Sequence, residues 1–339
     1  MNRMRTLSCA WLAIALLATA LPAPAREECP FLRDPAYHAR TPLPPAAAGE
    51  LAIGTLNAFR LFDDEQDGHE KTVLRRADFV ARIERMARYI ARDMGAPAVL
   101  GLQELEDDTA LAALAAALER ETGRRYTYLL GEKTRDGDIH SGLLLDARLQ
   151  LLRSESLFAA KPFDRGPRFD RLPLVAEVDA GAAWPGIGRL TLVVVHLKSQ
   201  SGMQRPDDAE CVREKRRAQA GRLAEWAREQ GAAPLVVLGD FNAPAQDPDP
   251  VRAEPMRILL DEGALVDVAG RFLQPGQRWT YRYRCSLQQL DHVLLGPVLV
   301  RKVRGYAIAR GDTCIRAREK CSAEKSVSDH EGVVLRLGR

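Results

Sequence analysis

The sequence predicts an α/β protein, α+β by its sheet topology, in which two mainly antiparallel β-sheets pack face to face and helices flank them as a four-layer sandwich. Short apolar segments of strand length recur along the chain and outnumber the helical segments. Many neighbouring strand segments have no helix between them, whereas a simple doubly wound sheet alternates strands with helices. Two packed sheets with helices outside account for both observations.

The individual elements follow from periodicity and from local end signals. In the segment 75–94, Phe79, Ile83 and Ile90 recur at helical spacing, and further on Asp108 is expected to cap an Ala- and Leu-rich helix. Helices are predicted over 75–94, 108–123, 209–229 and 255–262. Strands are predicted over 51–56, 98–104, 126–130, 142–145, 174–178, 190–197, 235–238, 290–295 and 333–337.

The N-terminal 25 residues have the pattern of a secretory signal peptide. Two arginines precede the apolar run from Leu7 to Leu21, and Ala23-Pro24-Ala25 supplies the small residues of a cleavage site. The apolar run is shorter than the roughly 20 residues of a membrane-spanning helix, and an uncleaved anchor is the alternative. We therefore expect a secreted or periplasmic protein, with cleavage near Ala25.

The rest of the chain divides into a Pro- and Ala-rich segment, 26–50, predicted to be a mobile arm, and one domain, 51–339. The formal net charge is only +3, so anion binding must come from local patches. Five basic residues within 213–222 form a solvated helix face or contact a polyanion. The aromatic and basic residues that alternate over 279–284 pack within a strand or direct arginines at substrate phosphates.

Five cysteines follow the signal segment, and an oxidising compartment would pair some of them. Cys314 and Cys321 close a short loop and are the first predicted pair. Cys211 with Cys285 is the second prediction, which leaves Cys29 unpaired, although connectivity does not follow from sequence. No CxxC pair or His/Cys spacing indicates a zinc site, so these cysteines are expected to be structural.

Polar side chains recur at the ends of the predicted strands, where a rigid backbone can hold several of them in fixed geometry. They offer carboxylates for a hard cation, imidazoles for proton transfer and amides for phosphate oxygens. Oxygen ligands fit Mg²⁺ or Mn²⁺ better than zinc. These residues are Asn57, Glu104, His196, Lys198, Asp240, Asn242, Asp291, His292, Asp329 and His330.

The order of these motifs, N, QE, H, GDFN, DH and SDH, resembles the endonuclease/exonuclease/phosphatase superfamily over about 51–337. Its members include pancreatic-type deoxyribonuclease, exonuclease III-type apurinic endonucleases, neutral sphingomyelinases and inositol-polyphosphate 5-phosphatases. Each motif alone is common, whereas all six in this order are specific. His196 lies where deoxyribonucleases and sphingomyelinases carry a second catalytic histidine, so the chain resembles an exported bacterial-type member of that branch.

The resemblance implies a divalent-metal site and a phosphate-binding site. Glu104 matches the family's principal metal ligand, Asp329 an additional metal-binding or water-positioning aspartate, and Asn57 an asparagine near the metal or the phosphate. Mg²⁺ is the expected cofactor, with Mn²⁺ or Ca²⁺ as alternatives. The FDRLP segment resembles a strand entry of deoxyribonuclease-like members, which makes Arg171 a candidate phosphate contact, and Lys198 is the second basic candidate for substrate binding.

The resemblance also implies the catalytic residues. Asp240 and Asn242 match the GDFN pair that orients the attacking water and holds the phosphate. His330 matches the general base or phosphate ligand, Asp291 the carboxylate that pairs with it, and His196 the second catalytic histidine. An imidazole near its usual pKa of about 6.5 exchanges protons at neutral pH, and a carboxylate behind it fixes its tautomer.

The other histidines are expected to lie outside the chemistry. His292 follows Asp291 directly, so in a regular strand its side chain points to the opposite face. His38 and His69 are expected at the surface. His140 precedes a strand at a position where the family often places a polar residue near the substrate, and we expect it to be structural.

The predicted function is hydrolysis of DNA, RNA or both by a metal- and His-assisted attack of water on phosphorus. A sphingomyelinase-like lipid phosphodiesterase is the alternative, but no cluster of Trp, Phe and Leu is predicted at the surface to reach a membrane interface. An inositol phosphatase fits less well, because CSLQQLDHVLL lacks that branch's motif. A third reading is a non-catalytic binding relative, for which the arm offers a docking site. We expect a monomer with nucleic acid as substrate, no stable membrane association and no obligate protein partner.

Overall fold

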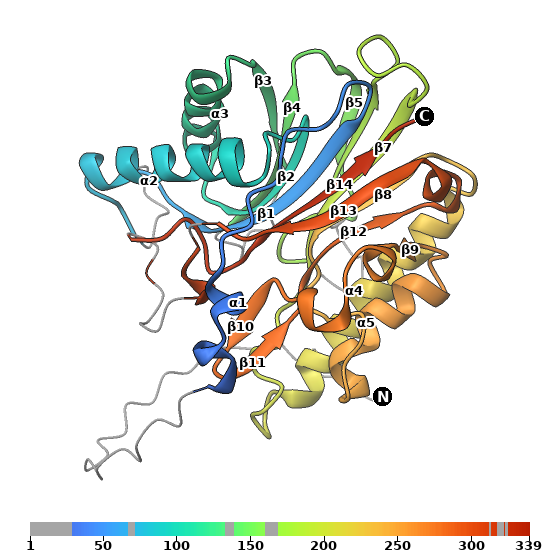
Figure 1. The fold of residues 1–339 in the computed structure, drawn as a ribbon. Coiled ribbons are helices and arrows are strands. Elements are labelled where there is room, and N and C mark those ends of the chain that lie inside the picture. The colour runs from blue at the N-terminus through green and yellow to red at the C-terminus, as the bar shows by residue number, and fades with distance from the viewer. Residues whose placement is uncertain are drawn as a thin grey trace.

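The fold is described from a computed structural model, which covers residues 29–66, 72–132, 139–159, 169–311, 313–316, 322 and 325–339. The predicted signal peptide, His69 and Cys321 lie outside these residues. Two six-stranded sheets pack face to face, and helices cover their outer faces (Figure 1). The predicted sandwich of two packed sheets flanked by helices is confirmed.

The first sheet has the strand order β13-β14-β1-β2-β4-β3. β1 and β2 run parallel, and the other neighbouring strands are antiparallel. The strands are β1 (Leu51–Leu61), β2 (Val99–Leu105), β3 (Tyr126–Leu130), β4 (His140–Asp146), β13 (Val303–Ala309) and β14 (Gly332–Leu337).

The second sheet has the strand order β5-β6-β7-β8-β12-β9. Here β7 and β8 are the parallel pair, so each sheet is mixed but mainly antiparallel. The strands are β5 (Gln150–Ser156), β6 (Leu174–Asp179), β7 (Arg189–His196), β8 (Leu235–Asp240), β9 (Val266–Asp267) and β12 (Asp291–Leu295). A separate hairpin is formed by β10 (Tyr281–Tyr283) and β11 (Ser286–Gln288).

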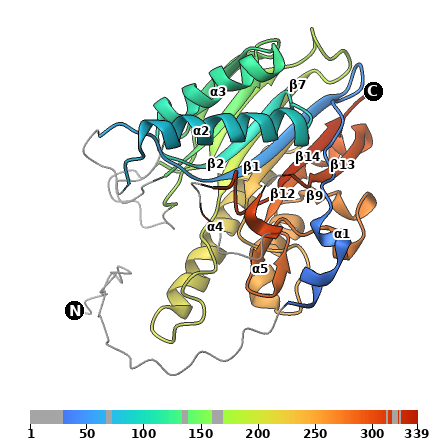
Figure 2. The same cartoon turned by 60° about the vertical axis from the view of Figure 1, so that its left-hand side comes forward.

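Two pairs of helices complete the outer layers. α2 (Arg76–Arg88) and α3 (Asp108–Thr122) lie side by side over the first sheet (Figure 2). α4 (Ala209–Glu229) and α5 (Pro250–Asp261) cover the second sheet. The π-helical turn η2 (Tyr89–Asp93) continues α2. The 3₁₀ turns are η1 (Pro30–Arg33), η3 (Ala269–Arg271), η4 (Pro275–Gln277), η5 (Pro297–Lys302) and η6 (Cys314–Arg316).

The main core lies between the two sheets. Val99 and Val333 from the first sheet meet Val194 and Leu238 from the second, and all four side chains are fully buried. Full burial of one such side chain stabilises the fold by about 1.5–3 kcal/mol. Because strand side chains alternate between faces, this one-sided burial sets the register of both sheets.

The structure corrects several predicted boundaries. α3 is capped by Asp107, whose Oδ1 accepts a hydrogen bond from the Ala110 N–H at 3.1 Å, and not by Asp108. α5 begins at Pro250, several residues before the predicted start, because proline is well suited to the first turn of a helix. The strands β5, β9, β10, β11 and β13 were not predicted, because they are short or carry polar residues.

The segment predicted to be a mobile arm packs against the domain over its described part, 29–50. Leu32 and Tyr37, from η1 and α1 (Pro35–His38), are buried with Trp279 in a small apolar cluster. The Tyr37 hydroxyl donates a hydrogen bond to the Ile315 carbonyl at 2.6 Å. The prediction was therefore wrong for these residues, since composition does not reveal that two apolar side chains find a partner surface.

Cys29 forms a disulfide with Cys285, with their Cα atoms 5.2 Å apart. This overturns the predicted Cys211–Cys285 pair and the prediction that Cys29 is unpaired. Cys211 and Cys314 are also disulfide-bonded, and none of the described cysteines is free. The predicted partner of Cys314, Cys321, lies outside the described residues. The pairing depends on which distant segments fold together, here η1 and the β10–β11 hairpin.

None of the helices in the described part of the chain has both the length and the apolar composition needed to cross a membrane.

Candidate active site

The two parallel strand pairs place their carboxyl ends at one end of the sandwich. In the first sheet, Asn57 on β1 pairs with Gln103 on β2, directly before Glu104. In the second sheet, His196 ends β7 opposite Asp240, which ends β8 and pairs in turn with Asp291 at the start of β12. The strand-end residues predicted from sequence are therefore brought together from both sheets.

Gly239 explains how Asp240 reaches this position. It has φ +144, and a Cβ atom at this residue would lie 2.0 Å from the Val195 carbonyl oxygen. Only glycine permits this conformation and this approach of β8 to β7. The glycine of the GDFN motif thus determines how the following carboxylate is presented.

His330 and Asp291 form a buried hydrogen-bonded pair. The Nδ1–H of His330 donates to Asp291 Oδ2 at 2.7 Å. The Thr280 hydroxyl accepts from the Asp291 N–H at 3.1 Å, and the Ser328 hydroxyl accepts from the His330 N–H at 2.9 Å. Both members of the pair are thereby fixed at the backbone, which leaves His330 Nε2 as the nitrogen available for proton transfer.

The environment of His330 favours its charged form. Burial alone would lower the pKa of the imidazole, but the negative charge and hydrogen bond of Asp291 raise it well above its usual value. Asp240 and Asp329 raise it further. A cation bound to these carboxylates would offset part of the negative charge that raises this pKa.

Asp240 is the most connected carboxylate of the site. Its Oδ2 accepts from Asn57 Nδ2 at 3.1 Å, and its Oδ1 accepts from the Asn242 N–H at 2.8 Å. Burial raises its pKa to about 7; His330 opposes the rise, and Asp291 adds to it. A carboxyl group with a pKa near neutrality can exchange a proton at working pH.

Glu104 and Asp329 add negative charge beside Asp240. Asn57 Nδ2 donates to Glu104 Oε1 at 3.1 Å, and Glu104 has φ +63 where the β2 pairing shifts register. Burial raises the pKa of Asp329 to about 6; His330 opposes the rise, and Glu104 contributes to it. Mutual repulsion of this kind among buried carboxylates is relieved by a cation.

The residues of the site fit a hard divalent cation. Its donors are carboxylate oxygens, an amide and imidazoles, without a thiolate. Ligand atoms of Asp240, Asp291 and His330 lie within 4.8 Å of one another. Asp291 Oδ1 is buried and has no hydrogen-bond partner among the described residues. A cation held beside this acidic and histidine-containing cluster, where Glu104 and Asp329 add negative charge, would offset that charge.

His196 is also buried, but it lies among positively charged groups. Its Nε2 lies 3.6 Å from Asp240 Oδ2, and its Nδ1 has no hydrogen-bond partner within the described part of the chain. Burial lowers its pKa well below the usual value, and the positive charges of Arg171, His330 and Lys198 lower it further. His196 is therefore neutral at pH 7.

Arg171 and Lys198 lie on the His196 side of the site. Arg171 donates from Nε to the His196 carbonyl at 3.4 Å and from Nη2 to the Leu197 carbonyl at 3.2 Å. Lys198 is half-buried, and burial lowers the pKa of its ammonium group. Two cations next to a neutral imidazole favour the binding of an anion.

Comparison with known proteins agrees with this geometry. The model of the endonuclease/exonuclease/phosphatase family matches residues 55–330. The chain belongs to this family. A search of the curated proteins finds no match.

Solved structures of family members share the fold. The structure of an endonuclease/exonuclease/phosphatase from Beutenbergia cavernae has a TM-score of 0.57 and 19% identity, over 85% of this chain and 71% of that chain. Truncated TDP2 from Caenorhabditis elegans has a TM-score of 0.54 and 16% identity, over 86% of this chain and 98% of that chain. TDP2 from D. rerio, complexed with single strand DNA product, has a TM-score of 0.54 and 20% identity, over 86% and 99% of the two chains.

Asn242, in the GDFN motif of the family, is supported by a residue that the sequence did not single out for this role. Asn242 has φ +52, and its Nδ2 donates to the Leu197 carbonyl at 3.1 Å. Arg216 donates to the Asn242 carbonyl at 2.9 Å and to the Lys198 carbonyl at 2.7 Å. Arg216 is only 3% exposed, so the predicted solvated face does not include it. Its helical spacing from Val212, also buried, is the signal that would have identified it.

Arg82 is a second buried arginine, and it supports the end of β1 directly after Asn57. It is 2% exposed and donates to the carbonyls of Ala58 at 3.0 Å, Arg60 at 2.6 Å and Phe59. Phe59 and Arg60 have positive φ values, where the β1–β2 register shifts. Burial lowers the pKa of Arg82 to about 10, and the charges of Glu104 and Asp329 oppose this. Its position beside Phe79 and Ile83 on the apolar helix face was the available signal.

His292 and His140 make their contacts outside the catalytic site. His292 Nε2 lies 3.0 Å from the Ala243 carbonyl, and its Nδ1 lies 3.1 Å from Gln289 Nε2, on the opposite face from Asp291 as expected. His140 Nδ1 donates to the Gly131 carbonyl at 2.6 Å. All three contacts are structural.

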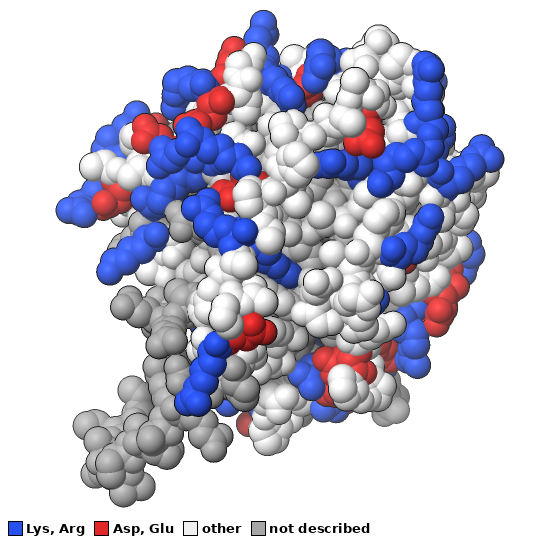
Figure 3. All heavy atoms as spheres, viewed as in Figure 1, with Lys and Arg blue, Asp and Glu red and all other residues white. Residues whose placement is uncertain are grey.

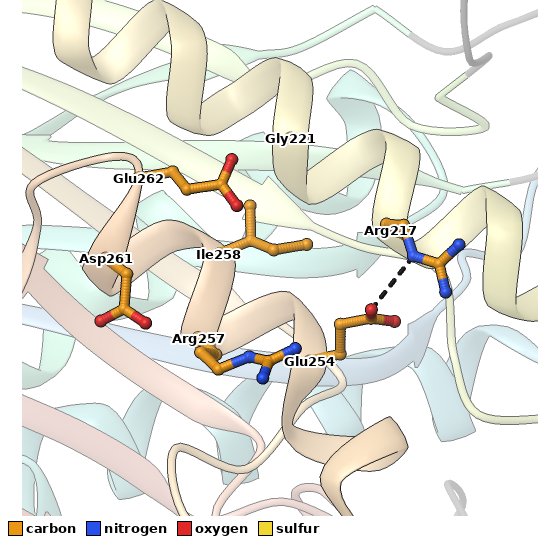
Figure 4. Close-up of a pocket in the computed structure, with 7 residues that line it drawn as sticks. All are labelled: Arg217, Gly221, Glu254, Arg257, Ile258, Asp261 and Glu262. Atoms are coloured by element: carbon orange, nitrogen blue, oxygen red, sulfur yellow. Dashed lines mark hydrogen bonds and ion pairs between the residues drawn. The ribbon is translucent and has the colours of Figure 1, made fainter.

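A groove of about 430 Å³ between α4 and α5 is separate from the site (Figure 4). None of the predicted site residues lines it. Arg217 and Glu254, which face each other there, form an ion pair at 3.0 Å. Most of the charged residues that line the groove therefore belong to the two packed outer helices α4 and α5.

Proposed function

We propose that the chain is a divalent-metal-dependent phosphodiesterase, and that it is a secreted or periplasmic nuclease acting on DNA, RNA or both. The observation that carries this proposal is the buried His330–Asp291 pair, with its 2.7 Å hydrogen bond, beside the carboxylate of Asp240. A proton-transferring imidazole beside a cation site is what hydrolysis of a phosphodiester by water requires.

In this proposal His330 accepts the proton of the attacking water through Nε2, while Asp291 holds the ring and stabilises its charged form. Asp240 and Asn242 orient the water and the phosphate. His196, which is neutral, hydrogen-bonds to a phosphate oxygen as the second catalytic histidine.

The charged groups around the phosphate have separate roles. Glu104, Asp329 and Asn57 would hold a divalent cation, Mg²⁺ or alternatively Mn²⁺ or Ca²⁺. When bound, such an ion neutralises charge that develops on the phosphate and leaving oxygens. Arg171 and Lys198 bind the phosphate from the side of His196, with Asn57 as a further contact.

Several observations support nucleic acid as the substrate over a lipid. The large hydrophobic side chains exposed in the described part of the chain are distributed over several elements, which does not favour one membrane-binding patch. They are Val73, Val80, Tyr128, Leu151, Leu152, Phe272 and Tyr283. Lys and Arg cover more of the face in Figure 3 than Asp and Glu do, as suits a polyanion. D. rerio TDP2, which shares the fold, was solved with a single strand DNA product.

The proposed location is the periplasm or the medium. The Cys29–Cys285 disulfide supports an oxidising compartment. We propose 1–25 as a cleaved signal peptide, 26–50 as an N-terminal segment and 51–339 as the catalytic domain. We further propose a monomer without stable membrane association or an obligate protein partner.

The test incubates purified 26–339 with plasmid DNA, RNA and sphingomyelin vesicles, each with Mg²⁺, Mn²⁺, Ca²⁺ or a chelator. We expect cleavage of nucleic acid that requires metal and is lost in His330→Ala. Turnover of sphingomyelin alone would replace the nuclease assignment with the lipid phosphodiesterase. If no substrate is turned over with any metal, or if His330→Ala is as active as the parent, the proposed mechanism is wrong.

A further inference from the structure

The β10–β11 hairpin stands directly beside the catalytic pair. Tyr281 on β10 forms a backbone bridge with His330, and the two ring centroids are 4.7 Å apart. Burial raises the pKa of Tyr281 to about 12, and Asp329 and Asp240 add to the rise. Tyr281 therefore forms part of the wall of the active site.

The two faces of this hairpin have different surroundings. Arg282 pairs with Leu287, and this face packs through Leu287 on the apolar cluster formed with the N-terminal segment. Tyr281 and Tyr283 alternate with Arg282, so they point to the opposite face, together with Gln288. This second face is directed at the active site, because Tyr281 on it contacts His330.

Gln288 connects that face to the catalytic residues. Gln200 Nε2 donates to Gln288 Oε1 at 3.0 Å and to the Asn242 carbonyl at 3.2 Å. The hairpin is thus held to the site at one end, where Tyr281 pairs with Gln288: by Tyr281 beside His330 and by Gln288 through Gln200. This end of the hairpin is therefore fixed relative to His330 and Asn242.

The tip of the hairpin is fixed covalently. Cys285, in the turn between the strands, is bound to Cys29, and the Cys29 segment is buried against Trp279. Tyr283, which precedes this turn, is nevertheless 55% exposed, more than any other large hydrophobic side chain that the structure describes. An exposed aromatic ring on a rigid support can bind a flat partner without a large loss of conformational entropy.

We propose that Tyr283 is a substrate-binding residue that stacks on a nucleobase next to the scissile phosphate, which deepens the proposed nuclease function and rests on it. Two residues along a strand span about 7 Å, so the ring lies within reach of a group attached to a phosphate at His330. The Arg284 guanidinium is 5.3 Å from the Tyr283 ring centroid. An aromatic ring beside a cation is the combination that binds single-stranded nucleic acid with little sequence preference.

The test compares two substrates that differ only in their bases: a short oligothymidylate and a strand of equal length made of abasic sugar-phosphate units. Both are titrated against the 26–339 protein and its Tyr283→Ala variant with Mg²⁺. We expect Tyr283→Ala to raise KM for the oligothymidylate about tenfold and to leave KM for the abasic strand unchanged. Tyr283→Trp, which keeps an aromatic surface, retains the parent KM for both.

Tyr128→Ala is the matched control, because Tyr128 is also exposed, at 42%, but lies on β3 in the first sheet. It should change neither KM. The inference is overturned if Tyr283→Ala affects both strands equally or neither, or if Tyr283→Trp behaves like Tyr283→Ala. If the parent protein cleaves neither strand but does cleave plasmid DNA or RNA, the inference fails and the nuclease function stands. If it cleaves none of these substrates, both fail.

Discussion

His330 and His196 are both buried in one site, and their pKa values shift in opposite directions. Burial acts on both imidazoles in the same sense, towards the neutral form. In His330 the opposing effect of Asp291, 2.7 Å from Nδ1, outweighs burial. His196 instead faces Arg171 and Lys198, and its Nε2 lies 3.6 Å from Asp240.

The difference shows that the charged groups around each imidazole, and not its depth of burial, decide the protonation state of these two histidines. It also separates the site into two halves. The His330 half is anionic and suits proton transfer and a cation. The His196 half is cationic around a neutral ring and suits a phosphate. The following predictions test this division.

The largest effect is expected for His330→Ala. Loss of the proton-transferring group should lower kcat on the order of 10³-fold, whereas His196→Ala should lower it only about 10²-fold. Initial rates at saturating substrate measure both. Equal losses in the two variants would contradict the division of the site into two halves.

Asp291→Asn should lower kcat about 10²-fold and shift its pH dependence. Asp291 raises the pKa of His330, so its neutralisation lowers that pKa. Because the neutral ring accepts the proton, the rising limb of the kcat–pH profile moves to lower pH. Asp267→Asn is the control: Asp267 lies 3.7 Å from His292 Nδ1, outside the site, and its replacement should not move the limb.

Arg171→Ala should raise KM about tenfold, because a charge-assisted phosphate contact is lost. It should also raise the pKa of His196, since one of the cations that lower it is removed. NMR titration of the His196 ring measures the second effect. Arg153→Ala, on the exposed strand β5, should change neither quantity, and an unchanged His196 pKa in Arg171→Ala would show that the two do not interact.

Arg82→Met should produce the smallest change in rate but raise the Mg²⁺ concentration needed for half-maximal activity several-fold. Loss of its three carbonyl contacts releases the β1 segment next to Asn57, and should lower the free energy of unfolding by about 1–3 kcal/mol. Arg88→Met, on the exposed side of the same helix, is the control. A lower melting temperature with an unchanged Mg²⁺ requirement would make Arg82 a purely structural residue.

Much of the fold and of the candidate site could be predicted before the structure. α4 was predicted with its observed limits, and the strands that carry Asn57, Glu104, His196 and Asp240 were predicted within a few residues. These features depend on local patterns: an apolar run of strand length, helical spacing, and polar residues where a strand ends. The order of the motifs along the chain then identified the family.

Contacts between distant segments could not be predicted in the same way. The Cys29–Cys285 disulfide joins residues 256 positions apart, and it contradicts a pairing chosen from the sequence. Arg82 was not singled out from the sequence, and Arg216 belonged to a basic run predicted to be solvated or to contact a polyanion. Each is buried against carbonyls of a strand end or loop. Arginine is usually exposed, so its burial follows only from the partners that the fold supplies.

The amino-acid sequence by itself determined nine of the strands, the four longer helices and which polar residues stand at the strand ends, because these follow from short-range periodicity. Only the tertiary structure decided that Arg171 faces His196, and that the N-terminal segment holds the hairpin that presents Tyr283. Electrostatic effects depend on distances of a few ångströms between residues far apart in the chain, and those distances exist only once the two sheets have packed.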